Sequence, residues 1–92
     1  MHVHEVTETE IKQKRRHFEA VKQIECQISF HQNGVSTLDV ALLSAREALF
    51  EEAKQAGAHV LVFEPYVTLS GREGESTLIL SARAYMYASE EQ

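Results

Sequence analysis

The fold is decided by the stretch LDVALLSAREALFEEAKQAG, residues 38–57. Its apolar residues recur every three or four positions, and this spacing places them on one side of an α-helix. Gly57 follows the last of them, as expected of a residue that ends a helix in the left-handed conformation. We therefore predict a helix over residues 38–56 whose apolar stripe packs against a sheet. The stripe consists of Leu38, Leu42, Ala45, Leu49, Ala53 and Ala56.

The residues before this helix alternate with a period of two, which is typical of a strand covered on one side. A continuous helix from Thr7 to Ile28 is the competing interpretation, because some apolar residues there also have heptad-like spacing. The strand fits better, since in a helix the run from Ile24 to Phe30 would scatter around the circumference. Residues 31–34 follow as a turn, with Ser36 or Thr37 as the helix cap. The apolar parity of the strand comprises Phe18, Ala20, Ile24, Cys26, Ile28 and Phe30.

Two more strands are predicted after the helix. Residues 59–70 are rich in β-branched and aromatic residues, and Pro65 interrupts them, which indicates an edge strand or a bulge. A loop at residues 71–75 contains two glycines, and alternation resumes over residues 76–87. The predicted fold is therefore α+β, a β-α-β-β unit in which a three-stranded sheet packs on one main helix.

The first 17 residues differ from the rest in composition. Glutamates are followed by a basic run, and Thr7 with Glu10 forms a capping-box pattern. A short helix over residues 8–16 and a mobile arm both remain open. We accordingly divide the chain into a charged N-terminal arm or short helix at residues 1–17 and a single domain at residues 18–92.

Composition limits the environment and the partners. The chain has 92 residues and a formal net charge of −5, and no apolar run is long enough to cross a membrane. Residues 1–10 lack the apolar core of a secretory signal. A single cysteine, Cys26, rules out an internal disulfide framework and fits a reducing compartment. We expect a cytoplasmic protein that does not engage membranes.

More apolar surface is predicted than one helix can bury. The strand after the helix is apolar on both parities, and the helix carries Val40, Leu43 and Phe50 away from its stripe. The N-terminal segment, a second copy or a ligand must cover these groups. Because symmetric association is the commonest solution for small proteins, we expect a homo-oligomer with Phe50 and Phe63 in its interface.

Metal ligands are present without a metal-site spacing. Five histidines accompany Cys26, but the pair Cys26 and His31 stands alone, and His2 with His4 can only collect a metal weakly. We predict no dedicated metal site and leave the identity of any metal ligand open. A heavy-metal or small-ligand site in a cleft between subunits, with His59 or Cys26, is the alternative function. The histidines are His2, His4, His17, His31 and His59.

The other charged residues favour structural roles. The basic run at residues 12–17 lacks aromatic residues for stacking, and the net charge opposes nucleic-acid binding. We interpret Glu64 and Arg83 as an ion pair between neighbouring strands. Neither catalytic residues nor a cofactor is predicted, and we expect a protein that is not an enzyme. The side chains considered for catalysis are the helix carboxylates Glu47, Glu51 and Glu52 and the hydroxyls of Ser70 and Ser81.

One stretch resembles a known family. The run AREALFEEAKQAGAHVLV, residues 45–62, is similar to the YbjQ family of small bacterial proteins, and more distantly to RcsF-like and YhcN-like domains. The resemblance covers residues 38–87 and implies a β-α-β-β unit, a homo-oligomer and a heavy-metal-binding label. The chain departs from the family in having LSARA at residues 80–84, where a glycine is usual, and in a shorter segment before the helix. No site residues are carried over.

The expected function is accordingly that of a non-enzymatic homo-oligomer that acts as a binding or assembly module.

Overall fold

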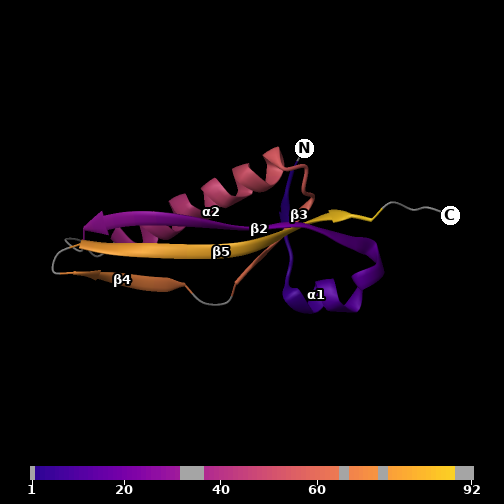
Figure 1. Cartoon of the computed structure of the whole chain (residues 1–92), viewed down its shortest axis with the longest axis horizontal. Coiled ribbons are helices and arrows are strands. Elements are labelled where there is room, and N and C mark those ends of the chain that lie inside the picture. Colours follow the sequence, from indigo (N-terminus) through magenta and orange to yellow (C-terminus); the bar gives the residue numbers. More distant parts are fainter. Residues whose placement is uncertain (1, 32–36, 65–66, 73–74, 89–92) are drawn as a thin grey trace.

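The computed structural model describes residues 2–31, 37–64, 67–72 and 75–88. Within them it contains five strands, two α-helices and one short 3-10 helix (Figure 1). In chain order the elements are β1 (His4–Glu5), α1 (Glu8–Gln13), the 3-10 helix η1 (Arg15–His17), β2 (Phe18–His31), α2 (Thr37–Gln55), β3 (Val60–Phe63), β4 (Thr68–Arg72) and β5 (Glu75–Tyr87).

All five strands belong to one sheet, organised around the long strand β5. The strand order is β1-β3-β5-β2, and β4 also pairs with β5. β2 runs antiparallel to β5 over its whole length, from Phe18 opposite Tyr87 to His31 opposite Glu75. On the other side of β5, β3 pairs with residues 82–85 and β4 with residues 75–79. β1 adds to β3 in parallel orientation.

Helix α2 covers one face of this sheet (Figure 1). Its alanines at 41, 45 and 53 and Leu49 are buried, so the helix axis lies close to the strands. Leu61 of β3 and Leu78 of β5 are fully buried beneath it. Each Å² of apolar surface removed from water contributes ~25 cal/mol to the free energy of folding, so this layer is the main source of stability. The buried core on this side consists of Ile24, Ala41, Ala45, Leu49, Ala53, Ala58, Leu61, Leu78, Leu80, Ala82 and Ala84.

The opposite face of β3 is covered by the N-terminal segment. Ile11 of α1 packs on Val60 and Val62, and Phe18 and Tyr85 pack beside them. β3 is therefore buried on both faces, which accounts for its continuous apolar sequence. The sequence left open whether the N-terminal segment, a second copy or a ligand covers the excess apolar surface, and on this face of β3 it is the N-terminal segment.

Helix α2 ends as its glycine predicts. Gly57 has a positive φ of 84°. The Ala58 N–H donates to the Ala53 carbonyl at 2.9 Å, and the Gly57 N–H donates to the Lys54 carbonyl at 3.1 Å. These two bonds form a Schellman motif, which satisfies carbonyls that the helix end leaves without partners.

The mixed architecture with one main helix on a sheet is confirmed, but the described sheet has five strands and not the three that we predicted. The structure adds β1 and divides the strand predicted at residues 59–70 into β3 and β4, on either side of Pro65. The main helix spans Thr37–Gln55 instead of 38–56, and helix α1 ends at Gln13. The predicted turn at 31–34 and loop at 71–75 are both too long, because His31 belongs to β2, Gly71 and Arg72 to β4, and Glu75 to β5. Residues 32–34 and 73–74 and the alternative cap Ser36 lie outside the described residues. Within the described ranges, no helix is both long and apolar enough to span a membrane.

Candidate functional site

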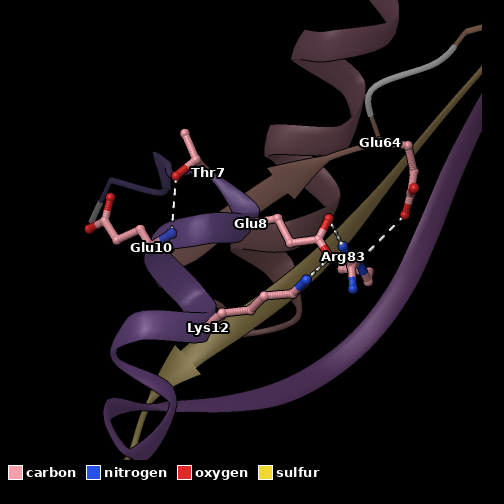
Figure 2. Close-up of polar contacts among 6 residues, drawn as sticks. All are labelled: Thr7, Glu8, Glu10, Lys12, Glu64 and Arg83. Carbon is pink, nitrogen blue, oxygen red and sulfur yellow. Dashed lines mark hydrogen bonds and ion pairs between the residues drawn. The ribbon is translucent and has the colours of Figure 1, made fainter.

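An ion network centred on Arg83 joins three parts of the fold (Figure 2). The Arg83 guanidinium, on β5, lies 3.4 Å from the Glu64 carboxylate just after β3 and 3.2 Å from the Glu8 carboxylate on α1. Glu8 also pairs with Lys12 at 3.6 Å. The carboxylates of Glu8 and Glu64 thus form ion pairs with the cations of Arg83 and Lys12. The Glu8–Arg83 pair links helix α1 to strand β5 of the sheet.

Helix α1 is short, and its first turn is held by its cap. The Thr7 hydroxyl accepts a hydrogen bond of 3.1 Å from the Glu10 N–H, as the sequence pattern predicts. Ile11, three residues after Glu8 and therefore on the same side of the helix, packs in the core against β3. The side chains of Glu8 and Lys12 extend from this helix towards Arg83 (Figure 2).

Arg83 is satisfied by charge more than by hydrogen bonding. Its Nε is buried and has no hydrogen-bond partner among the described residues, although the Glu64 Oε2 lies 3.4 Å away. That distance permits Coulomb attraction, whereas the geometry does not meet that of a hydrogen bond. Arg83 and Glu64 are each about one-third exposed, so solvent weakens the attraction. The predicted cross-strand pair is confirmed, and Glu8 is an additional partner that sequence reasoning missed.

A cavity of about 430 Å³ lies beside this network, between α1 and the sheet. Apolar and aromatic side chains and three cations form its wall. Phe18 and Tyr85 meet edge to face there, with ring centroids 6.4 Å apart. We call this space the Arg83 cavity. Its lining consists of Glu8, Ile11, Lys12, Arg15, Phe18, Ala20, Arg83 and Tyr85.

A second hollow of about 530 Å³ lies on the other side of α1 and contains two of the histidines. His4 and His17 line it together with Glu10 and Tyr87. No group of three or more His, Cys, Asp or Glu side chains in the described residues is arranged to hold a metal ion.

The remaining candidate ligands are dispersed. His2 is exposed near the start of the chain, and His59 stacks on Tyr87. Cys26 is half-buried on β2, where burial, and secondly the Glu52 carboxylate, raise the pKa of its thiol. The side chain of His31 lies outside the described residues.

The helix carboxylates are divided between two places, and neither lies with the strand hydroxyls. Glu47 and Glu51 are exposed on α2 and line a hollow of about 380 Å³ together with His2. Glu52 instead pairs with Lys22 of β2 at 3.6 Å. Ser70 is exposed on β4, and Ser81 lies half-buried on β5.

Phe50 and Phe63, expected in a subunit interface, contact each other within the chain. Their rings meet edge to face at 5.5 Å, and the Arg46 guanidinium lies 4.4 Å from the Phe63 ring centre. Both rings also pack on the core. Val40 and Leu43, on the side of α2 away from the sheet, stay 59% and 58% exposed.

Among the described residues, the outer edge of β2 is a long open feature of the sheet. Within the described chain, no strand lies beyond it. The strand has 14 residues, with a register irregularity near Val21. From Gln23 to His31 it contains neither proline nor a cationic Lys or Arg, and Glu25 is its only acidic residue. We call this stretch the β2 edge.

Comparison of the chain with protein-family models, with curated proteins and with solved structures yields no match.

Proposed function

We propose that the protein is a non-enzymatic assembly module that forms a homo-oligomer by pairing its β2 edge with that of a second copy. The observation that carries this proposal is the length of the edge and the fact that no described residues protect it. Edge strands are normally kept short, or are guarded by lysine, proline, a bulge or a covering element. β2 is far longer than the usual five or six residues, and its only irregularity lies before Lys22.

The direction of the free backbone groups follows from the register. Successive residues of a strand direct their N–H and C=O groups to alternate sides. Ser81 directs its carbonyl to the β3 side, where the Glu64 N–H donates to it at 2.9 Å. Its neighbour Ala82 therefore directs its backbone groups to Ile24 of β2, and Ile24 directs its own back to β5. Because the direction alternates along β2, the residues on either side of Ile24 direct their backbone groups outward. The outward N–H and C=O groups of the β2 edge belong to Gln23, Glu25, Gln27 and Ser29.

The flank of α2 beside the edge leaves room for a neighbour. Ser44, Ala48 and Glu52 lie four residues apart and share one side of the helix. Glu52 reaches Lys22, so this side faces β2. Ser44 and Ala48 are small and exposed, and the helix of a second copy can approach them closely.

Charge favours some registers of the pairing over others. An antiparallel pair centred on Glu25 would place two carboxylates opposite each other, which is unfavourable. Centring on Gln27 instead places Glu25 opposite Ser29 of the second copy. A two-fold axis at Gln27 is therefore the register we propose, and it closes the assembly as a dimer.

The test is a proline at the edge. Gln27→Pro removes an outward N–H without removing a bond to β5, because residue 27 does not donate to β5. Gln27→Thr is the matched control, since it keeps the N–H and favours a strand. Native mass spectrometry should find dimers for the natural chain and for Gln27→Thr, and monomers with an unchanged far-UV circular dichroism spectrum for Gln27→Pro. A monomeric natural chain, or a dimer that survives Gln27→Pro, would overturn the proposal.

A second pair of variants tests the helix flank. Ala48→Arg places a bulky cation where the helices of two copies would meet, and Val40→Arg places the same side chain on the side of α2 away from the sheet. Edge pairing predicts that Ala48→Arg weakens the dimer and that Val40→Arg leaves it intact. The reverse result would assign the interface to the outer side of α2.

A further inference from the structure

We propose that the Arg83 cavity binds a small organic anion with a flat apolar body, such as an aromatic carboxylate. The site lies within one subunit and does not depend on pairing of the β2 edge. Its volume of about 430 Å³ falls within the range of small-molecule pockets.

The first support is an excess of positive charge in the wall. Lys12, Arg15 and Arg83 line the cavity from α1, η1 and β5, against the single carboxylate of Glu8. Even with Glu64 counted, three cations face two carboxylates. This local excess stands out in a chain whose net charge is −5.

The second support is that one of these cations has no carboxylate partner among the described residues. Glu8 is shared between Lys12 and Arg83, and Glu64 pairs with Arg83. In the described part of the chain, no carboxylate lies within ion-pair distance of Arg15. Arg15 is therefore the cation available to a ligand, while Arg83 is held in place as part of the scaffold. A guanidinium presents two parallel N–H groups, which suit a carboxylate or phosphate group.

The third support is the apolar part of the wall. Phe18 and Tyr85 offer ring surfaces, and Ile11 and Ala20 add aliphatic surface. A flat ring can lie against these groups while its charged end reaches Arg15 and Lys12. A mostly apolar lining with a few convergent charges is the usual composition of a ligand pocket. An inorganic anion would leave the apolar part of this wall unused.

The experiment compares an anion with its neutral counterpart. 1-Naphthoate and 1-naphthamide are titrated into ¹⁵N-labelled protein, and backbone amide shifts are followed by NMR. We expect saturable shifts for naphthoate in α1, at Phe18 and at Tyr85, and at least about threefold weaker binding of the neutral amide, the scale of one partly exposed ion pair. Naphthyl phosphate in a parallel titration tells whether the site prefers a carboxylate or a phosphate group.

Matched variants locate the charge. Arg15→Gln should weaken naphthoate binding by at least about threefold and leave the neutral amide unaffected. Arg16→Gln removes the same charge one residue away, outside the cavity lining, and should leave both affinities unchanged. Equal binding of the two probes, equal effects of the two variants, or shifts confined to another part of the fold would each overturn the proposal. So would the absence of saturable shifts with every probe.

Discussion

The imidazole of His59 stacks on the phenol ring of Tyr87, with centroids 4.7 Å apart, and its Nδ1 accepts a 3.0 Å hydrogen bond from the Tyr87 backbone N–H. One side chain thus joins the approach to β3 to the end of β5. An Nδ1 that accepts a hydrogen bond carries no proton, so the neutral ring holds its proton on Nε2. This tautomer is directly visible in the ¹⁵N chemical shifts of the imidazole.

Replacing His59 should separate its two contributions. His59→Phe keeps a ring for stacking but removes the acceptor, and we expect it to lower the free energy of unfolding by about 0.5–1.5 kcal/mol. His59→Ala also removes the stacking and should cost a further ~0.5–1.5 kcal/mol. Urea unfolding measures both losses. The exposed His2→Ala is the control, and a His59→Phe variant as stable as the natural chain would show that the hydrogen bond contributes nothing.

The Arg83 network should contribute little per pair. A double-mutant cycle with Arg83→Met and Glu64→Gln should give a coupling of about 0.5–1 kcal/mol, because both side chains are one-third exposed. The Lys12–Glu8 pair, exposed by 73% and 47%, should give a coupling near zero. High salt should reduce the first coupling. A larger coupling for the Lys12–Glu8 pair would contradict this ranking.

Local periodicity predicted α2 and β2, because each buries one face and repeats its pattern over many residues. β1 has two residues and no pattern of its own. It exists because His4 and Glu5 lie opposite Val60 and Leu61, a pairing that only the folded chain creates. Pro65 marked the break between β3 and β4, but it did not reveal that both pair with β5.

The candidate site was less accessible to sequence reasoning than the fold. Glu64 and Arg83 were paired correctly because they lie on successive predicted strands, which tend to be neighbours in a sheet. The pairing holds although β4 lies between β3 and β5 in the chain. The Glu8 contact depends on where α1 packs, and a single buried anchor, Ile11, decides that. That Arg15 has no carboxylate partner among the described residues becomes visible only in the folded structure.

Two glycines should resist substitution for different reasons. Gly57 has a φ of 84° and open space where a Cβ would lie, so Gly57→Ala is penalised by backbone strain alone, about 1–2 kcal/mol. At Gly71, a Cβ would lie 2.3 Å from the Glu75 carbonyl oxygen, and the backbone must move to admit it.

Asparagine distinguishes these two causes. Gly57→Asn should recover part of the stability lost in Gly57→Ala, because asparagine tolerates the left-handed conformation. Gly71→Asn should recover none of the stability lost in Gly71→Ala, since the Cβ of either residue meets the same carbonyl oxygen. Thermal unfolding of the four variants tests this, and recovery at both positions would contradict the assignment.

The Cys26 thiol should make the free energy of unfolding depend on pH in the alkaline range. Burial and the Glu52 carboxylate raise the pKa of its thiol above the ordinary value of 9.0. Above pH 9.0 the unfolded chain therefore releases the thiol proton while the folded chain retains it, and the balance shifts towards unfolding. The stability associated with the protonated thiol is complete below that pH and is lost as the pH rises through the folded pKa. Cys26→Ala should lack this loss, with a difference in slope of at most ~1.4 kcal/mol per pH unit.

The thiol itself reports the cause of the shift. Alkylation by iodoacetamide follows the thiolate, so its rate in the folded chain should rise at a higher pH than in the urea-unfolded chain. Glu52→Gln should move that midpoint only part of the way back, because burial is the larger cause. Glu51→Gln, a neighbouring exposed carboxylate on the same helix, is the control and should leave the midpoint in place. Equal midpoints in the folded and unfolded chains would contradict the raised pKa, and equal effects of the two variants would remove Glu52 as a specific cause.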